Sequence, residues 1–256
     1  ELIALYNYMS QILVELVKLA SLIITLTKAT ACGNRIGEVL NQAPEASAQP
    51  KDGTPLENGS AITFRDVSMI YKNAGAESLE GITFDIAHGQ TLGIIGSTGS
   101  GKSTLVNLIP RFYHTSKGQI LIDGKDIESY SEESLRDKIG VVAQKSVLFK
   151  GTVRSNLQWG DTDADDRTLD EALKTAQAYD FIMQKDGGLD AVVEQGGKNF
   201  SGGQRQRLCI ARALAKRPEI LILDDSSSAL DYATDAKLRM ALRELPYHPT
   251  TVIVSQ

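Results

Sequence analysis

The hydrophobic and polar positions divide the chain into three parts. Residues 2–31 are mostly apolar and helix-forming, residues 41–60 are polar and rich in proline, glycine and alanine, and short strand-like runs begin at residue 61. The first pattern predicts a long helix and the second a linker. The third predicts a folded domain that mixes strands and helices.

Charged residues interrupt the apolar N-terminal segment. With Glu15, Lys18 and Lys28 in place, no charge-free run reaches the roughly 20 residues that a lipid-exposed span needs. Two structures fit this pattern: a soluble amphipathic helix, or the last helix of a membrane domain whose charges face a cavity or neighbouring helices. Hydropathy alone does not separate the two.

The strand-like runs are of two kinds. Alternating apolar and polar positions predict antiparallel strands at residues 62–64, 67–71 and 79–86. Continuous apolar runs, typical of parallel strands buried on both faces, occupy residues 91–95, 139–142, 220–223 and 251–254. Between the runs at residues 139–142 and 220–223, apolar residues recur with the period of a helix. One predicted helix carries Leu169, Ala172, Leu173 and Ala176 on a single face, and another covers residues 205–216.

A glycine-rich stretch follows the run at residues 91–95 and leads into a predicted helix. It comprises Gly96, Ser97, Thr98, Gly99, Ser100, Gly101, Lys102, Ser103 and Thr104. Glycines let the backbone wrap closely, so that N–H groups and the helix N-terminus point at a phosphate. In this spacing Lys102 would reach the β- and γ-phosphates, and the Ser103 hydroxyl would bind Mg²⁺. The alternative is a flexible turn without a ligand.

Polar residues end four of the apolar runs. They are Gly96, Gln144, the pair Asp224 and Asp225, and the pair Ser255 and Gln256. In open α/β sheets, ligands bind at the carboxyl ends of the strands. Asp224 in this position can hold Mg²⁺, although an aspartate there can also cap the next helix. Asp225 is placed to polarise water as a general base.

A second loop with phosphate-site character precedes residues 205–216. The order Ser201, Gly202, Gly203, Gln204 has the spacing of a capping box, which would explain it by structure alone. Two glycines in a first turn weaken a helix by roughly 1 kcal/mol each, however, and their use is close approach of the backbone to an anion. Tyr71 can stack on an adenine, although a tyrosine at a strand end usually belongs to the core or its rim.

Composition narrows the classes further. The 256 residues carry a net charge of −5 and are 42% hydrophobic, enough for one sizeable core and without the basic surplus of a broad nucleic-acid binder. Cys32 and Cys209 lie far apart, which favours a reduced, cytosolic setting, and the three histidines are scattered. Since the chain begins with glutamate and ends straight after a strand-like run, we expect a fragment of a longer polypeptide.

Together these residues resemble the nucleotide-binding domain of ABC transporters, in particular an exporter half-transporter with membrane and ATPase domains in one chain. The matches are Walker A (Gly96 to Thr104), Walker B (residues 220–224), the Q-loop (Gln144), the signature (residues 200–204), the D-loop (residues 228–231, with Asp231) and the adenine-stacking aromatic (Tyr71). The joint occurrence of these motifs in this order is highly specific.

The resemblance implies an architecture and a location. Residues 1–40 would be the end of the last transmembrane helix with its cytoplasmic extension, residues 41–60 a linker, and residues 61–256 a nucleotide-binding domain truncated at its C-terminus. That domain would be a P-loop NTPase with a RecA-like, mostly parallel sheet, an antiparallel β subdomain and a helical subdomain at about residues 152–216. It would lie on the cytoplasmic side of the cell membrane and use ATP and Mg²⁺, with Ser103, Gln144 and Asp224 at the metal.

Two departures from the family pattern concern hydrolysis. The catalytic glutamate after Walker B is Asp225 here, one methylene shorter, and the switch histidine is Gln256, which cannot carry a proton. A carboxylate withdrawn by more than an ångström should cost orders of magnitude in rate. In the family, each site joins the Walker motifs of one subunit to the signature of the other. We therefore expect a heterodimer in which this chain binds ATP with little hydrolysis, while Ser201, Gly202, Gly203 and Gln204 complete the partner's site.

Other classes fit less well. A homodimeric exporter would carry two weakened sites. A chromosome-associated ATPase of the SMC type would insert a long coiled coil between Walker A and the signature, and this sequence has no sustained heptads there. The apolar N-terminal segment disfavours a regulatory ATPase without transport, and a P-loop kinase has no use for the second loop. The sequence does not identify the transported substrate.

Overall fold

The computed structural model describes residues 1–41, 59–72, 74–226 and 228–255. The chain separates into two compact units, Glu1–Ser47 and Ala48–Gln256. Most of the expected linker and Gln256 lie outside the described residues.

The described part of the first unit forms one helix, α1 (Leu2–Leu40). This helix is described throughout, and none of its 39 residues is buried. By length and composition it is apolar enough to cross a membrane, with a mean hydropathy of 1.7 over its most apolar 18-residue window. The Glu15 carboxylate accepts a hydrogen bond from Lys18 Nζ at 2.7 Å, so the two charges in the middle of the apolar segment neutralise each other. Cys32 lies exposed on the same helix.

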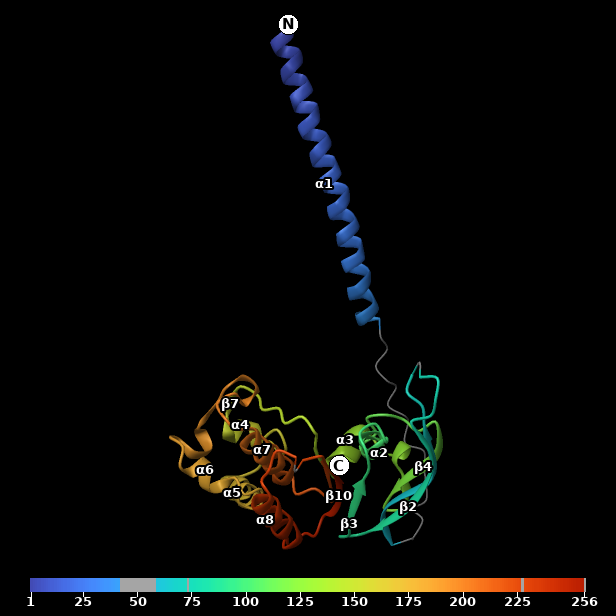
Figure 1. The fold of residues 1–256 in the computed structure, drawn as a ribbon, viewed down its shortest axis with the longest axis vertical. Coiled ribbons are helices and arrows are strands. Elements are labelled where there is room, and N and C mark those ends of the chain that lie inside the picture. Colours follow the sequence, from blue (N-terminus) through green and yellow to red (C-terminus); the bar gives the residue numbers. More distant parts are fainter. Residues whose placement is uncertain (42–58, 73, 227, 256) are drawn as a thin grey trace. The chain divides into compact units, whose positions relative to one another are not determined.

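The second unit contains an antiparallel sheet of four strands in the order β2-β1-β4-β5. Two of these strands, β2 and β4, are labelled in Figure 1. The strands are β1 (Ser60–Met69), β2 (Leu79–Ala87), β4 (Lys117–Ile122) and β5 (Lys125–Asp126). The prediction of two separate strands before residue 71 is wrong: β1 is continuous, and an irregularity at Asp66 (φ 48°) shifts its register between Phe64 and Val67. The strand also ends at Met69, because the N–H of Ile70 bonds to Ser116 Oγ instead of continuing the ladder.

A parallel sheet in the order β3-β10-β9-β6 forms the centre of the unit. Its strands are β3 (Thr91–Ile95), β6 (Ile139–Val142), β9 (Ile220–Asp224) and β10 (Thr250–Ser255). All five residues of β9 are buried, as the apolar run predicts. The expectation of a buried strand is wrong for β3, since among the described residues β3 pairs with β10 alone and Ile95 is 79% exposed.

One hydrophobic core joins the two sheets. It contains residues of β1, β4, β9 and β10 together with the short helix α2 (Lys102–Leu108), and its largest fully buried side chains include Phe64, Leu108 and Ile120. Helix α3 (Glu132–Asp137) and the short turn η1 (Ile127–Ser129) contribute Leu135 and Ile127 to this core. Buried Arg111 holds η1 in place by donating hydrogen bonds to the carbonyl oxygens of Ile127 and Tyr130 at 2.7 and 3.0 Å.

A helical segment with its own core lies on the other side of β10 from the antiparallel sheet (Figure 1). It comprises β7 (Gly151–Thr152), α4 (Val153–Leu157), α5 (Asp166–Thr175), α6 (Tyr179–Met183), η2 (Gly188–Asp190), β8 (Val192–Val193), η3 (Gln195–Gly197) and α7 (Gly202–Ala215). Helix α8 (Tyr232–Arg243) follows β9 and packs against α5.

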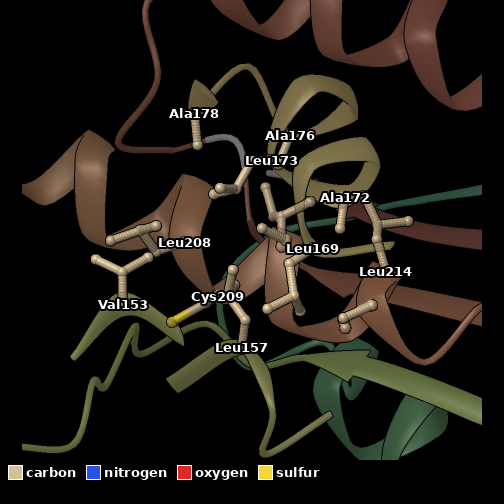
Figure 2. Packing of buried hydrophobic residues seen from close by; sticks show 14 of the residues in the cluster. Val153, Leu157, Leu169, Ala172, Leu173, Ala176, Ala178, Leu208, Cys209 and Leu214 are labelled. Carbon is tan, nitrogen blue, oxygen red and sulfur yellow. The ribbon is translucent and has the colours of Figure 1, made fainter. Parts of the chain in front are cut away.

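The sequence predicts the packing of the helical segment well. The four positions assigned to one helix face, Leu169, Ala172, Leu173 and Ala176, are all buried. Figure 2 shows them in the same cluster as Leu208 and Leu214 of α7. Helix α7 starts at Gly202, three residues before the predicted start. Cys209 is buried in this core, and its burial raises the pKa of its thiol.

Candidate nucleotide-binding site

The loop between β3 and α2 is shaped by its glycines. Gly101 has a φ of 85°, and a Cβ there would lie 2.9 Å from the carbonyl oxygen of Ser78. A Cβ on Gly96 would lie 2.7 Å from Ser100 Oγ. No side chain caps the first turn of α2, which lies wholly within the described residues, so its N–H groups are available to an anion.

Lys102 lies over this loop. Its Nζ donates hydrogen bonds to the carbonyl oxygens of Gly96 at 2.6 Å and Ser97 at 2.8 Å. These contacts hold a positive charge beside the uncapped N–H groups. The loop therefore presents both kinds of group that bind phosphate, backbone donors and an ammonium.

A buried carboxylate faces the loop from the end of β9. Asp224 is 7% exposed and accepts a hydrogen bond from Ser103 Oγ at 3.1 Å. Burial raises the pKa of Asp224 above its usual value, and the hydrogen bond from Ser103 opposes that rise. A desolvated carboxylate beside a hydroxyl is a donor set that suits Mg²⁺. The alternative role of capping the next helix falls to Asp231, which accepts the N–H of Thr234 at 2.9 Å.

Asp225 and Gln144 meet at the same edge of the sheet. Gln144 Nε2 donates to Asp225 Oδ2 at 3.3 Å, although the two residues are 81 positions apart in the sequence. The backbone of Asp225 is left-handed (φ 47°), and its carbonyl oxygen accepts a hydrogen bond from Ser228 Oγ at 3.0 Å. Strand β10 also holds this backbone in place, because the N–H of Asp225 donates a hydrogen bond to the Val254 carbonyl oxygen at 3.2 Å.

Tyr71 lies beside the loop rather than in a strand. Its hydroxyl is 2.9 Å from Thr104 Oγ1, and its ring packs edge-on against Tyr113 with centroids 5.1 Å apart. Part of the side chain remains accessible to solvent. An aromatic ring is therefore held next to the phosphate-type loop, where a flat apolar ligand group can contact it.

These groups line one open cleft of about 630 Å³. Its lining comprises Tyr71, Ala74, Gly75, Ala76, Glu77, Ser78, Thr98, Gly99, Ser100, Gly101, Lys102, Ser103, Thr104, Gln144, Asp224, Asp225 and Val254. The sequence did not point to the segment from Ala74 to Ser78, because its residue types carry no recognisable chemistry. The closest sequence signal is Gly101, whose missing Cβ leaves room for that segment.

The second glycine loop lies elsewhere. Ser201 and Gln204 form the capping box that their spacing predicts, with the Gln204 N–H donating to Ser201 Oγ at 3.2 Å and the Ser201 N–H to Gln204 Oε1 at 3.0 Å. A Cβ on Gly203 would lie 2.9 Å from the carbonyl oxygen of Ala229, so this loop packs closely on the segment before α8. Neither this loop nor Asp231 is among the residues that line the cleft.

The strand, glycine loop, uncapped helix and buried carboxylate define a P-loop nucleoside-triphosphate site. The family model described as "ABC transporter" matches residues 79–228, more than half of the chain. The chain therefore belongs to the ABC transporter family, and its fold is that of the family's nucleotide-binding domain. Helix α1 is compatible with the end of a transmembrane domain.

Known proteins agree with this assignment. YfiB of Bacillus subtilis, an uncharacterised ABC transporter ATP-binding protein, is 42% identical over the whole chain, which spans 44% of YfiB. The ATP-dependent lipid A-core flippase of Saccharophagus degradans is 40% identical over 94% of the chain and 40% of the flippase. A solved bacterial Atm1-family ABC exporter with ATP bound superposes with a TM-score of 0.80 at 34% identity, covering 91% of this chain and 40% of that one. The chain thus spans less than half the length of these relatives, and its likeness is to exporters.

Proposed function

We propose that this chain binds ATP with Mg²⁺ in the cleft and belongs to an exporter that couples this binding to transport across a membrane. The observation that carries the proposal is the meeting of Lys102, Ser103, Asp224, Asp225 and Gln144, from three separate stretches of the chain, around one glycine-rich loop. Exporter relatives of the same fold support it.

Each residue has a role in this proposal. The loop N–H groups and Lys102 bind the β- and γ-phosphates, and Tyr71 stacks on the adenine. Ser103 and Asp224 hold Mg²⁺, with Gln144 beside them, and the metal supplies neutralisation of the phosphate charge. Asp225 accepts a proton from the attacking water, and Gln144 orients its carboxylate.

We further propose that hydrolysis at this chain's own site is slow. Asp225 is shorter than the family's glutamate, so its carboxylate lies farther from the water that it must activate. Gln256, which lies outside the described residues, can hydrogen-bond to a phosphate but cannot carry a positive charge. Both changes would affect the same nucleotide.

The position of the second glycine loop supports pairing with another subunit. Ser201, Gly202 and Gly203 start helix α7 and do not line the chain's own cleft. Their N–H groups would complete the cleft of a partner subunit, with Gln204 and Asp231 nearby. We propose a heterodimer whose partner supplies the competent hydrolytic carboxylate.

The membrane role rests on α1, whose apolar surface is exposed along its whole length. We propose that α1 belongs to the membrane domain of a multi-pass subunit, with the nucleotide-binding domain on the cytoplasmic side. The lipid A-core flippases among the relatives make an amphiphile a reasonable first substrate to test.

The decisive experiment measures steady-state ATP hydrolysis by the full-length subunit alone and mixed with its partner, in lipid. We expect negligible turnover alone and robust turnover together. Replacing Ser201 and Gly202 should abolish the activity of the mixture, whereas Asp225→Asn should leave most of it. Strong hydrolysis by this subunit alone would contradict the asymmetric pair and indicate a homodimer in which Asp225 serves as the base.

A further inference from the structure

A second cleft lies away from the phosphate loop, between α5, the end of α7 and the segment that joins α8 to β10. Its volume is about 720 Å³, larger than that of the nucleotide cleft. Ala172, Leu214, Ala241 and Leu245 contribute apolar surface to its lining. It shares no lining residue with the nucleotide cleft. The exposed surface of the lining is mostly apolar, although many of the lining residues are polar or charged, and a cleft of this size and mixed character can accept a small molecule.

Charge is distributed unevenly around this cleft. Glu171 accepts hydrogen bonds from two guanidinium groups, Arg167 Nε at 3.1 Å and Arg217 Nη2 at 2.9 Å. The hydrogen bond from Arg167, followed by that from Arg217, lowers the pKa of Glu171. Lys174 and Glu244 also line the cleft, which gives three cations against two carboxylates. The lining therefore has a surplus of positive charge.

The cleft also holds a phenol that stays neutral. Burial raises the pKa of Tyr247 to about 12, while nearby Arg217 acts in the opposite direction. At physiological pH its hydroxyl is therefore able to donate a hydrogen bond, and Tyr247 is one of the residues that line the cleft. A donor near cations favours a ligand that carries acceptor oxygens and a negative charge.

We propose that this cleft binds an organic anion with an apolar body, such as an aromatic or aliphatic carboxylate. The charged group would contact Arg217 and the hydroxyl of Tyr247, and the body would cover Ala241 and Leu245. A polyphosphate fits less well for two reasons. Glu171 binds both Arg167 and Arg217 and so offsets one of their two positive charges, and much of the lining surface is apolar. The ligand would touch both α5 and the segment before β10, and so would join the helical segment to the parallel sheet.

The test uses the full-length protein in lipid nanodiscs and the probe 4-benzoylbenzoate, an aromatic carboxylate that cross-links to protein under near-ultraviolet light. Mass spectrometry identifies the labelled peptides. We expect saturable labelling of α5 and residues 241–247 that saturating ATP does not reduce. The matched amide, 4-benzoylbenzamide, should label these peptides about tenfold less, as expected for loss of one charge-assisted hydrogen bond.

Three variants complete the test. Arg217→Gln should weaken labelling by 4-benzoylbenzoate about tenfold, because it removes one charged contact with the carboxylate. Ala241→Trp should block the cleft for both probes, and Lys237→Gln, an exposed charge change on α8, should alter neither. Thermal unfolding confirms that each variant is folded.

Equal labelling by the two probes, or labelling that is insensitive to both Arg217→Gln and Ala241→Trp, would overturn the proposal. Displacement of the probe by ATP would likewise overturn it by assigning the labelling to the nucleotide cleft. Since labelling requires no hydrolysis, a negative result here leaves the proposed transport function to its own test.

Discussion

Asp225 combines a short side chain with a left-handed backbone (φ 47°) that is fixed by Val254 and Ser228. Because the backbone is fixed, the carboxylate cannot advance toward the nucleotide by a backbone shift. Asp225→Glu adds the missing methylene, so we expect phosphate release by this subunit alone to rise at least about tenfold, since proton transfer depends steeply on reach. Phosphate release under saturating Mg·ATP measures it.

The control for that prediction is the double variant Asp225→Glu with Lys102→Ala. It should lose ATP binding and return the rate to background. An unchanged rate in the single variant, with ATP still bound, would show that reach is not what limits hydrolysis at this site.

The carboxyl of Asp224 has a raised pKa in the folded chain, so its charge costs folding free energy at neutral pH. The stability that it contributes is greatest below its unfolded pKa and is lost as pH rises through its folded pKa. Asp224→Asn removes that cost and keeps an acceptor for Ser103. We therefore expect a higher melting temperature at pH 7 without nucleotide, and a smaller difference near about pH 4, where carboxyl groups protonate.

The same variant should lose the stabilisation that Mg·ATP gives the parent protein, because the metal loses its charged ligand. Differential scanning fluorimetry with and without Mg·ATP measures both effects. A lower melting temperature at pH 7 without nucleotide would argue against the burial cost, and an intact Mg·ATP shift would argue against a metal role.

At the scale of elements, the two glycines that start α7 are not equivalent. A Cβ on Gly202 would lie 4.0 Å from Ala229 Cβ, an ordinary contact, whereas one on Gly203 would lie 2.9 Å from the Ala229 carbonyl oxygen. Gly202→Ala should therefore stabilise the protein by up to about 1 kcal/mol through helix propensity. Gly203→Ala should destabilise the protein, because the backbone at Ala229 would have to move to make room for the new Cβ. Thermal unfolding of the two variants compares them directly, and equal shifts would contradict the packing seen here.

The helical segment depends on its own core, in which Leu173 is fully buried (Figure 2). Leu173→Ala should cost about 2–5 kcal/mol of unfolding free energy, the range for leucine truncation in a packed interior. Met240→Ala on α8, where the side chain is 62% exposed, should change it by less than about 0.5 kcal/mol. Urea titration followed by circular dichroism measures both. Similar values for the two would mean that the segment's core is loosely packed.

The sequence patterns predict most of the helices and strands described above, and the exceptions have physical reasons. The spacing of the glycine loop predicts the roles of Lys102 and Ser103, and the position of Asp224 at the carboxyl end of an apolar run predicts that it faces them, because both patterns are local. The sequence pattern predicts two strands where β1 is a single one, because the single irregular residue Asp66 resembles a turn in the sequence. The contact between Gln144 and Asp225 depends on the pairing of β6 with β9, which periodicity does not specify.

Other parts of the site carry no sequence signal. The segment from Ala74 to Ser78 enters the cleft only because the chain turns back after β1. The exposure of β3 depends on which strands pair with it, and its apolar residues resemble those of a central strand. Packing between distant segments decides both features, so a reading of local residue types misses them.

For the molecule as a whole, α1 has an entirely exposed apolar surface, which predicts membrane association of the 256-residue chain. Alkaline carbonate should leave the chain in the membrane pellet. Replacing Leu16 and Ile23 with lysine should release it, because each charge at mid-span costs about 2.5–3.5 kcal/mol on insertion. The matched control replaces the same residues with phenylalanine and should stay in the pellet. Release of the parent chain would instead indicate a helix that lies in water.

The two cysteines differ sharply in chemical access. Cys209 is buried, and its burial raises the pKa of its thiol, whereas Cys32 is exposed on α1. Of these two cysteines, a maleimide should therefore modify only Cys32 in the folded chain. Because thiolate must form in water to react, the labelling rate at Cys32 would report the depth of that turn of α1 relative to the lipid surface.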